Sequence, residues 1–219
     1  MALTYAIGDI HGSLNKLTAL MTRCAEHAGS TAPIYVFLGD YIDRGPEARG
    51  VIDYLIALQS RFPTRVIALK GNHEAMALAA VDDAAAARLW LAQGGLETLA
   101  SYGIAHPGAL PEPHRNWLRS LRLSFDDGRR LFVHAGIDPL RPLDAQLEQD
   151  LLWMREPFLS YAGDHGRLIV HGHTPLARGV PDLRSNRLNL DTAAVYGGPL
   201  TAAVFNDEQT CPLGFLQAR

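Results

Sequence analysis

The sequence predicts an α/β fold in which a largely parallel sheet is covered by helices. Short apolar runs typical of strands alternate with segments typical of helices, and three such units recur at about 30 residues, the length of a βαβ unit. The chain has 219 residues, of which 47% are hydrophobic. A chain of this size buries roughly 70% of its unfolded surface, so we expect one domain over residues 1–219.

The three repeated units share one order of strand, turn and helix. Ser13 is a typical N-cap after the first turn, and Pro46 suits the first turn of the second helix. The turns are rich in glycine, which lets the backbone bend sharply, and they carry Asp, His or Asn. We expect strands at residues 3–7, 34–38 and 65–69, turns at 8–12, 39–46 and 71–74, and helices at 13–27 and 46–60.

The pattern changes over residues 75–123, which are rich in alanine and have no strand signal. We interpret them as a helical excursion that caps the sheet, with a break at Gly94-Gly95, and not as a separate domain. Strand patterns resume after it. The expected helices are residues 82–91, 96–101 and 113–121, and the expected later strands are 131–133, 168–170, 188–190, 200–205 and 214–217.

Composition excludes several classes of protein. Lys and Arg number 20 against 23 Asp and Glu, with no run of five like charges, so nucleic acid is not expected as a partner. Two cysteines, Cys24 and Cys211, exclude a disulfide framework and a thiolate zinc site. Asp9 interrupts any signal-peptide core, and no apolar run reaches about 18 residues, so we expect a cytoplasmic protein without a membrane segment.

Acidic, imidazole and amide side chains follow five of the expected strands. Ligands of open α/β sheets bind at the carboxyl ends of the strands, so these side chains are expected to meet at one rim. Asp9 and His11 are two residues apart and point to the same side of an extended segment, as two ligands of one ion must. Nine histidines against two cysteines favour borderline or hard divalent ions. The side chains concerned are Asp9, His11, Asp40, Asn72, His134 and His173.

Five short motifs occupy these turns. They are Gly-Asp-Ile-His-Gly at 8–12, Gly-Asp-Tyr-Ile-Asp-Arg-Gly at 39–45, Gly-Asn-His-Glu at 71–74, His-Ala-Gly at 134–136 and Gly-His-Thr-Pro at 172–175. In this order they resemble the calcineurin-like metallophosphoesterases, within them the phosphoprotein phosphatase branch and its small bacterial and phage serine/threonine phosphatases. The resemblance covers residues 1 to about 205 and implies mixed β-sheets sandwiched by helices in layers.

The resemblance implies a centre of two divalent metal ions. It assigns Asp9, His11 and Asp40 to the first ion, and Asp40, Asn72, His134 and His173 to the second, with Asp40 as the bridge. Manganese is the ion that the small bacterial branch implies, while iron, zinc, nickel and cobalt suit the same donors. Many family members carry another histidine where this chain has Pro175, so water is expected to complete the first ion's shell.

The resemblance also implies a mechanism in which a bridging hydroxide attacks phosphorus in line. His73 would protonate the departing alkoxide, and Asp43 would orient His73. Arg44 and Arg155 would hold the phosphate oxygens, with Asn72 and Tyr196 as further substrate contacts.

Other histidines, arginines and tryptophans have simpler interpretations. Arg155 could instead pair with Glu156 or Asp150. His171 is expected to be structural or to lie behind the ligands. The tryptophans are expected to be packing residues, with Trp153 also positioning Arg155. Surface or structural positions are expected for His27, His106, His114 and His165.

Three functions follow from these residues. The first is a serine/threonine protein phosphatase, a monomer acting on phosphorylated proteins and small phosphoesters. The second is a symmetrical dinucleoside polyphosphate hydrolase, such as acts on diadenosine tetraphosphate; Asp43-Arg44-Gly45 and Glu74 depart from the pattern of that group. The third is an inactive scaffold, which would have lost a ligand or His73. A cysteine phosphatase and a P-loop enzyme are excluded because their motifs are missing. The physiological substrate stays open, because residues 75–123 match no motif.

Overall fold

Two five-stranded sheets form the centre of the protein in a computed structural model that describes residues 2–219. The first sheet has the order β10-β9-β1-β2-β3. Strands β1, β2 and β3 are parallel to one another, and β9 is antiparallel to both of its neighbours, β1 and β10. Every residue of the central strand β1 is buried, because both faces of this sheet are covered. Its strands are β1 (Leu3–Ile7), β2 (Ile34–Phe37), β3 (Val66–Ala68), β9 (Leu200–Asn206) and β10 (Gly214–Ala218).

The second sheet is also mixed and has the order β4-β5-β6-β8-β7. Its three central strands are parallel, and the edge strands β4 and β7 are antiparallel to their neighbours. The strands are β4 (Ser124–Asp126), β5 (Arg130–Val133), β6 (Leu168–His171), β7 (Asp182–Leu183) and β8 (Arg187–Asn189).

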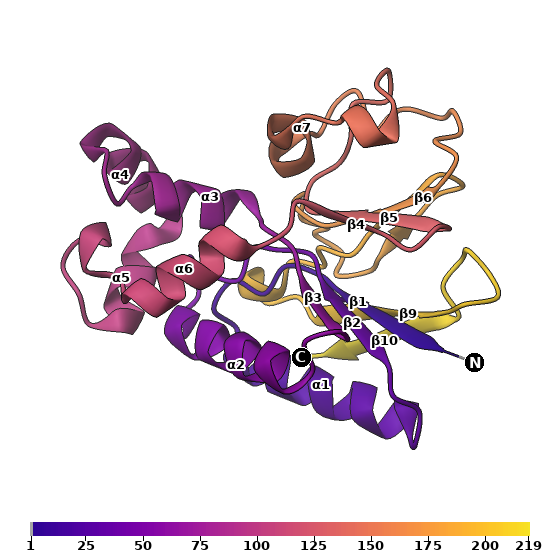
Figure 1. The fold of residues 1–219 in the computed structure, drawn as a ribbon, viewed down its shortest axis with the longest axis horizontal. Coiled ribbons are helices and arrows are strands. Elements are labelled where there is room, and N and C mark those ends of the chain that lie inside the picture. Colours follow the sequence, from indigo (N-terminus) through magenta and orange to yellow (C-terminus); the bar gives the residue numbers. More distant parts are fainter. Residues whose placement is uncertain (1) are drawn as a thin grey trace.

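Apolar residues from both sheets form the layer between them, and helices cover the outer faces (Figure 1). Phe132 of the second sheet contacts Phe205 of the first edge to face, with ring centres 6.1 Å apart. Helices α1 (Leu14–Ala28) and α2 (Ala48–Arg61) bury their apolar sides against the first sheet. The short helix α7 (Glu148–Trp153) lies over the second sheet.

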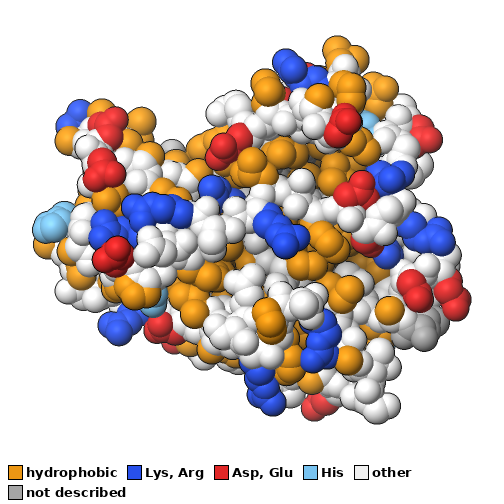
Figure 2. All heavy atoms as spheres, viewed as in Figure 1, with side chains coloured by type: hydrophobic (Ala, Val, Ile, Leu, Met, Phe, Trp, Pro, Cys, Tyr) orange, Lys and Arg blue, Asp and Glu red, His pale blue; other side chains and the backbone are white. Residues whose placement is uncertain are grey.

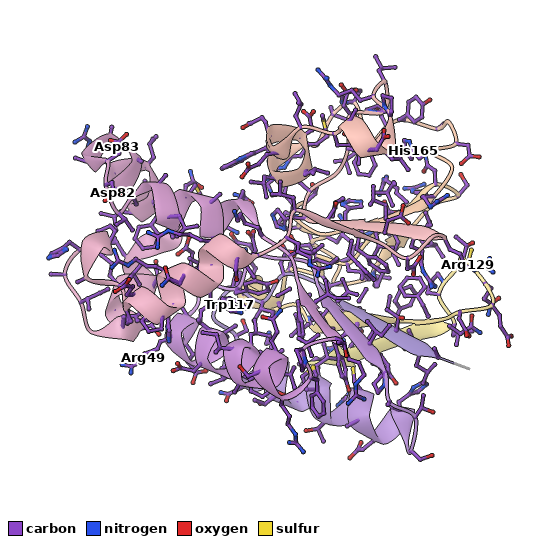
Figure 3. All side chains as sticks on the ribbon, in the orientation of Figure 1. Arg49, Asp82, Asp83, Trp117, Arg129 and His165 are labelled. Atoms are coloured by element: carbon purple, nitrogen blue, oxygen red, sulfur yellow. The ribbon has the colours of Figure 1, made fainter. Side chains whose placement is uncertain are left out.

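A helical arm, residues 72–120, connects β3 of the first sheet to β4 of the second (Figure 1). A π-helical turn, Leu91–Gly95, joins its two middle helices and is kinked at Gly94, where φ is 109°. The Asp83 carboxylate caps α4 by accepting the amides of Ala85 and Ala86, and Figure 3 shows Asp82 and Asp83 at the tip of the arm. The helices of the arm are α3 (Asn72–Ala79), α4 (Ala84–Trp90), α5 (Leu96–Tyr102) and α6 (Glu112–Ser120). Three short 3₁₀ turns occur at Pro107–Ala109, Leu143–Ala145 and Ala194–Tyr196.

The structure confirms the α/β class, the layered mixed sheets and the helical excursion, but a single largely parallel sheet was the wrong expectation. Successive right-handed crossovers place α1 and α2 on the same face of the first sheet, which leaves its other face open. The second sheet fills that face in place of helices. Near the arm, an isolated parallel bridge pairs Leu69, just after β3, with Arg122, just before β4. None of the helices in residues 2–219 combines the length and apolar character needed to cross a membrane.

We predict that Phe205→Ala destabilises the protein through the layer between the sheets. The Phe205 ring is fully buried against Phe132 and the Arg130 guanidinium, so its removal leaves a cavity and is expected to cost about 3–5 kcal/mol of unfolding free energy. Urea denaturation of the metal-free protein measures this. Leu213→Ala is the control, because Leu213 is 45% exposed and its loss is expected to cost less than about 0.5 kcal/mol. Similar costs for both variants would contradict the description of this core.

Candidate active site

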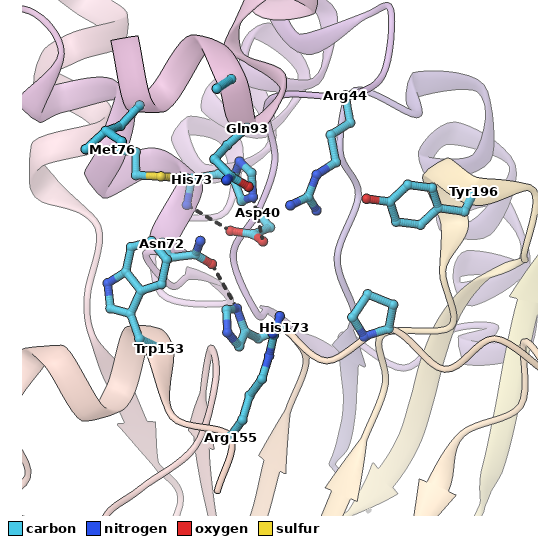
Figure 4. Close-up of a pocket in the computed structure, with 13 residues that line it drawn as sticks. Asp40, Arg44, Asn72, His73, Met76, Gln93, Trp153, Arg155, His173 and Tyr196 are labelled. Carbon is cyan, nitrogen blue, oxygen red and sulfur yellow. Dashed lines mark hydrogen bonds and ion pairs between the residues drawn. The ribbon is translucent and has the colours of Figure 1, made fainter. Parts of the chain in front are cut away.

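The carboxyl ends of β1, β2, β3, β5 and β6 converge at the end of the sandwich that faces the helical arm (Figures 1 and 4). The structure brings together there all six side chains that the sequence assigned to metal ions. Each has at most 8% of its surface exposed: Asp9, His11, Asp40, Asn72, His134 and His173. Asn72 and His73 lie in the first turn of helix α3, where the sequence predicted a turn before the helical excursion.

The backbone of this site adopts unusual conformations. Among the described residues other than glycine, six have a positive φ, and five of these belong to the site: His11, Asp40, Asp43, Arg44 and His173. A left-handed conformation costs a residue with a side chain on the order of 1–3 kcal/mol. The surrounding structure must therefore hold these turns, and it does so in part by close backbone packing. A Cβ atom at Gly71 would overlap the Asp40 carboxylate, so only glycine fits there.

The donors of the second predicted metal position face one another without hydrogen atoms between them. The Nδ1 atom of His134 donates to the Leu38 carbonyl at 2.9 Å, which leaves Nε2 with a lone pair. Burial lowers the pKa of His134, which keeps the ring neutral. Its Nε2 lies 2.8 Å from Oδ1 of Asn72 and 3.4 Å from Oδ1 of Asp40, both acceptors. A cation among these atoms would turn three repelling lone pairs into ligands.

The fourth donor of this group is His173. Its Nδ1 atom lies 2.9 Å from the same Asn72 oxygen. Burial and the neighbouring His134 lower the pKa of His173 to about 3, so this ring is also neutral. Its backbone amide donates to the Asp9 carboxylate, with N–O distances of 3.0 and 3.3 Å, which links the second group of donors to the first.

The donors of the first predicted position are arranged in the same way. The Nδ1 atom of His11 donates to the Ile42 carbonyl at 2.8 Å, so Nε2 faces the site, 3.4 Å from Oδ2 of Asp40. Arg44 donates to this Nε2 at 2.7 Å, and an ion bound there would replace it. Burial followed by the nearby Asp191 and Asp40 raises the pKa of Asp9 well above its ordinary value. Three buried carboxylates in one place are a charge arrangement that divalent cations relieve.

The positions of these donor atoms fit a pair of metal ions. Ligands bound at about 2.1 Å with angles near 90–110° lie roughly 3.0–3.4 Å apart, and the donor distances above, 2.8–3.4 Å, are close to this range. Two groups of His and Asp side chains converge closely enough to hold an ion: His11, Asp40 and His73, and Asp40, His134 and His173. The first group contains His73 in place of Asp9, which the resemblance had assigned to this position. Asp40 belongs to both groups. Burial acts to raise the pKa of Asp40, but His134, His73 and His11 together hold it well below its ordinary value.

His73 and Asp43 form a buried pair beside the donors. The Nδ1 atom of His73 lies 2.6 Å from Oδ2 of Asp43, and both side chains are at most 1% exposed. The other ring nitrogen, Nε2, lies 3.9 Å from Oδ2 of Asp40. Two side chains of the helical arm, Trp90 and Thr98, also donate to the Asp43 carboxylate. His73 therefore has one nitrogen held by Asp43 and one directed towards the centre of the site.

A cavity of about 520 Å³ opens over these groups, between the arm and the segment that carries α7 (Figure 4). Figure 2 shows the molecular outline indented between the tip of the arm and this segment, with Lys and Arg interspersed among Asp and Glu over this face. Arg44 and Arg155 reach the cavity from two sides. Its remaining lining residues are Asp40, Asn72, His73, Met76, Leu89, Ala92, Gln93, Trp153, His173, Pro175 and Tyr196.

Comparison with known proteins agrees with this geometry. Residues 3–205 match the model of the calcineurin-like phosphoesterase family. The chain belongs to this family. A serine/threonine-protein phosphatase 1 of Salmonella typhimurium is 32% identical over 91% of this chain and 90% of its own. A bis(5'-nucleosyl)-tetraphosphatase of the asymmetrical type, PrpE of Geobacillus thermodenitrificans, is 30% identical over 93% of this chain and 91% of its own.

Solved structures show the same fold. A crystal structure assigned provisionally as a diadenosine tetraphosphatase superposes with a TM-score of 0.73 and 24% identity, covering 99% of this chain and 94% of that one. The calcineurin-like phosphoesterase fold of the chain is thus shown by sequence and by structure. Members of the family depend on two metal ions, and the site of this chain has side chains that could bind such ions. The chain is therefore a metal-dependent hydrolase of phosphoesters.

The structure also places the remaining arginine and histidines of this phosphoesterase for which the sequence left alternatives open. Asp150 pairs with Arg141 and Glu156 accepts from Ser160, while Arg155 reaches the cavity. His171 is fully buried beside Phe158, with ring centres 5.0 Å apart. The chain turns at Gly172 and His173, so the two histidines do not share a side as they would on a continuous strand. Figure 3 shows His165 far from the arm, in the part of the molecule that carries the second sheet.

Two residues near the site have roles that the sequence did not predict. Trp153 was expected to be a packing residue, but it is 38% exposed and its ring meets His173 edge to face at the cavity. Glu74 accepts four backbone amides, from Asp40, Tyr41, Ile42 and Gly71, at 2.8–3.3 Å, and so holds the second turn against helix α3. A Glu three residues into the helix is the capping-box position, which could have indicated this role.

We predict that Asp40→Asn abolishes metal binding at both positions. Asp40 is the side chain that the two groups of donors share, and an amide lacks the charge that draws a divalent ion. The metal content is expected to fall from about two ions per chain to near zero, as measured by elemental analysis after dialysis. Asp53→Asn, which alters a half-exposed carboxylate on α2, should retain both ions. An unchanged metal content in Asp40→Asn would show that Asp40 does not bridge.

Proposed function

We propose that the protein is a metal-dependent phosphomonoester hydrolase that acts on phosphoserine and phosphothreonine. The observation that carries this proposal is the buried His73–Asp43 pair at the edge of the cavity. The alkoxide of serine or threonine leaves poorly without a proton, whereas a nucleotide leaves a phosphoanhydride readily. A positioned acid therefore contributes most to cleavage of an alkyl phosphomonoester.

In this proposal, Asp43 accepts a hydrogen bond from the Nδ1–H group of His73 and so directs Nε2 and its proton towards the leaving oxygen. Arg44 and Arg155 hold the phosphate oxygens from two sides of the cavity, and Tyr196 and Asn72 contact the substrate at its edge. Arg44 is positioned by its left-handed backbone and lies 5.9 Å from the ring of Tyr196. Holding the phosphate in one orientation is the principal task of these side chains.

Asp9, His11 and Asp40 would hold one ion, and Asp40, Asn72, His134 and His173 the other. When bound, the two ions supply charge neutralisation at phosphorus and an activated water for attack. The proposal takes manganese as the native ion and residues 1–219 as one catalytic domain, acting as a monomer in the cytoplasm.

A second candidate is hydrolysis of dinucleoside polyphosphates, and two observations favour it. PrpE, a relative over most of the chain, carries that activity in its name and is of the asymmetrical type, whereas the sequence had suggested the symmetrical type. Two exposed aromatic rings, Trp153 and Tyr196, line the cavity, and nucleobases stack on such rings.

The two candidates are separated by a comparison of kcat/KM on a phosphoserine and phosphothreonine peptide panel and on diadenosine tetraphosphate, with manganese present. We expect the best peptide to exceed the dinucleotide by at least about tenfold, which corresponds to about 1.4 kcal/mol of transition-state binding. A preference for the dinucleotide of the same size would replace the first proposal by the second.

We predict that His73→Ala retains both metal ions but loses most of its turnover on alkyl phosphates. Loss of the proton donor is expected to lower kcat about 100- to 10,000-fold on a phosphoserine peptide. The loss on 4-nitrophenyl phosphate should be smaller, because nitrophenolate leaves without a proton. Metal content and both rates are measured on the same sample. His106→Ala, on an exposed loop, is the matched control. Equal losses on both substrates would contradict the role of His73 as the acid.

A further inference from the structure

The carboxylate of Asp43 receives three side-chain hydrogen bonds, all from residues of the helical arm, and two of them come from beyond helix α3. The Trp90 indole donates to Oδ2 at 2.7 Å, and the Thr98 hydroxyl donates to Oδ1 at 2.6 Å. The third partner is Nδ1 of His73, at 2.6 Å from Oδ2. All four side chains are at most 1% exposed, so water does not compete for these bonds. Both oxygens of Asp43 are thus held from the arm side.

The arm also holds the backbone at this point. The Thr98 oxygen accepts the Asp43 amide at 2.9 Å, so one hydroxyl bonds both the main chain and the side chain of Asp43. The carbonyl of Gly94 accepts the Arg44 amide at 3.1 Å. Asp43 and Arg44 both have a positive φ, of 71° and 67°. The arm therefore stabilises the strained turn from which both side chains enter the site.

A kink in the arm makes this double contact possible. Residues eight apart on a continuous α-helix lie about 80° apart around its axis. The π-helical turn Leu91–Gly95 separates Trp90 from Thr98, and its kink at Gly94 turns both side chains onto Asp43. A Cβ atom at Gly94 would lie 2.7 Å from Cγ of Arg44, so the close approach requires glycine there.

We infer that Trp90 and Thr98 are positioning residues that orient the His73–Asp43 pair for proton donation to the leaving group of an alkyl phosphomonoester. The inference rests on the proposed function. The three donors bond both carboxylate oxygens and so fix the rotamer of Asp43. With Asp43 fixed, the His73 ring has one orientation, in which Nε2 faces the centre of the site.

Proton donation by His73 accompanies cleavage of the phosphate ester. The bond between phosphorus and the ester oxygen breaks, and its electron pair stays on that oxygen. The Nε2 proton of His73 goes to this oxygen and yields the alcohol, while water supplies the oxygen that phosphorus gains. One proton of this water stays on the phosphate, and the other leaves to solvent, from which Nε2 of His73 is protonated again before the next turnover. The imidazolium becomes a neutral imidazole that keeps its Nδ1 bond to Asp43. Trp90 and Thr98 exchange no proton and act only through Asp43.

A purely structural role makes a different prediction from a positioning role. If Trp90 and Thr98 only attach the arm to the sheets, their loss should reduce turnover on all phosphoesters by the same factor. If they orient the acid, the loss should fall on substrates whose leaving group needs a proton. The ratio of turnover on a phosphoserine peptide to turnover on 4-nitrophenyl phosphate separates the two roles.

The test compares Thr98→Val, which keeps the shape but removes the hydroxyl, with Thr98→Ser, which restores it. Thr98→Val is expected to lower kcat at least about tenfold on the phosphoserine peptide and less than about threefold on 4-nitrophenyl phosphate. The tenfold loss is smaller than the full contribution of a general acid, because His73 itself is retained. Thr98→Ser should return the ratio to within about threefold of the original protein. Equal losses on both substrates, or no rescue by serine, would overturn the inference.

Two further variants keep the test decisive. Trp90→Phe removes the indole donor but retains most of the buried ring; it carries the test if Thr98→Val unfolds, and it should shift the ratio in the same direction. Ser101→Ala, on the same helix as Thr98, removes a hydroxyl that bonds the Arg49 amide and should leave the ratio unchanged. Metal content and melting temperature are measured for each variant.

His73→Ala in the same series separates this inference from the proposed function. If His73→Ala changes the ratio and neither Thr98→Val nor Trp90→Phe does, the acid role stands and the positioning role is wrong. If His73→Ala leaves the ratio unchanged, both are wrong. A shift in all three variants, with serine rescue, supports both.

Discussion

The burial of one carboxylate, Asp40, is the constraint on which the rest of this structure depends. Its two oxygens lie 3.4–3.9 Å from ring nitrogens of three histidines, His11, His73 and His134, and Oδ1 accepts the His73 amide at 3.1 Å. A charge in the interior is stable only when such partners surround it. Its backbone is left-handed, and Glu74 holds its amide. The turns around it are shaped by the need to bring these partners to one point.

The two-sheet architecture meets that need because it directs the ends of strands from distant parts of the chain to one place. Parallel strands β1, β2 and β3 carry three turns to the same edge of the first sheet, and β5 and β6 bring His134 and His173 from the second. The apolar layer between the sheets provides the stability that strained turns lack on their own. The calcineurin-like phosphoesterase fold of the chain is therefore also what assembles its site.

The helical arm has two roles at the site. It lines one wall of the cavity with Met76, Leu89 and Gln93, and from its interior it bonds the Asp43 carboxylate. Substrate shape and orientation of the proposed acid thus depend on the same segment. The relatives that share this fold differ in the substrates their names record, from phosphoproteins to dinucleoside tetraphosphates.

The sequence by itself determined the α/β class, the strand ends and the set of polar residues that meet there. The strand at 3–7, the turn after it and the following helix are encoded locally, by an apolar run and by glycines, so local sequence patterns were sufficient to predict them. Only the tertiary structure decided that the strands form two sheets, that Trp153 is half exposed beside His173, and that Trp90 and Thr98 bond Asp43. These contacts join residues about 20 to 55 positions apart, and no periodicity records which distant segments will pack together.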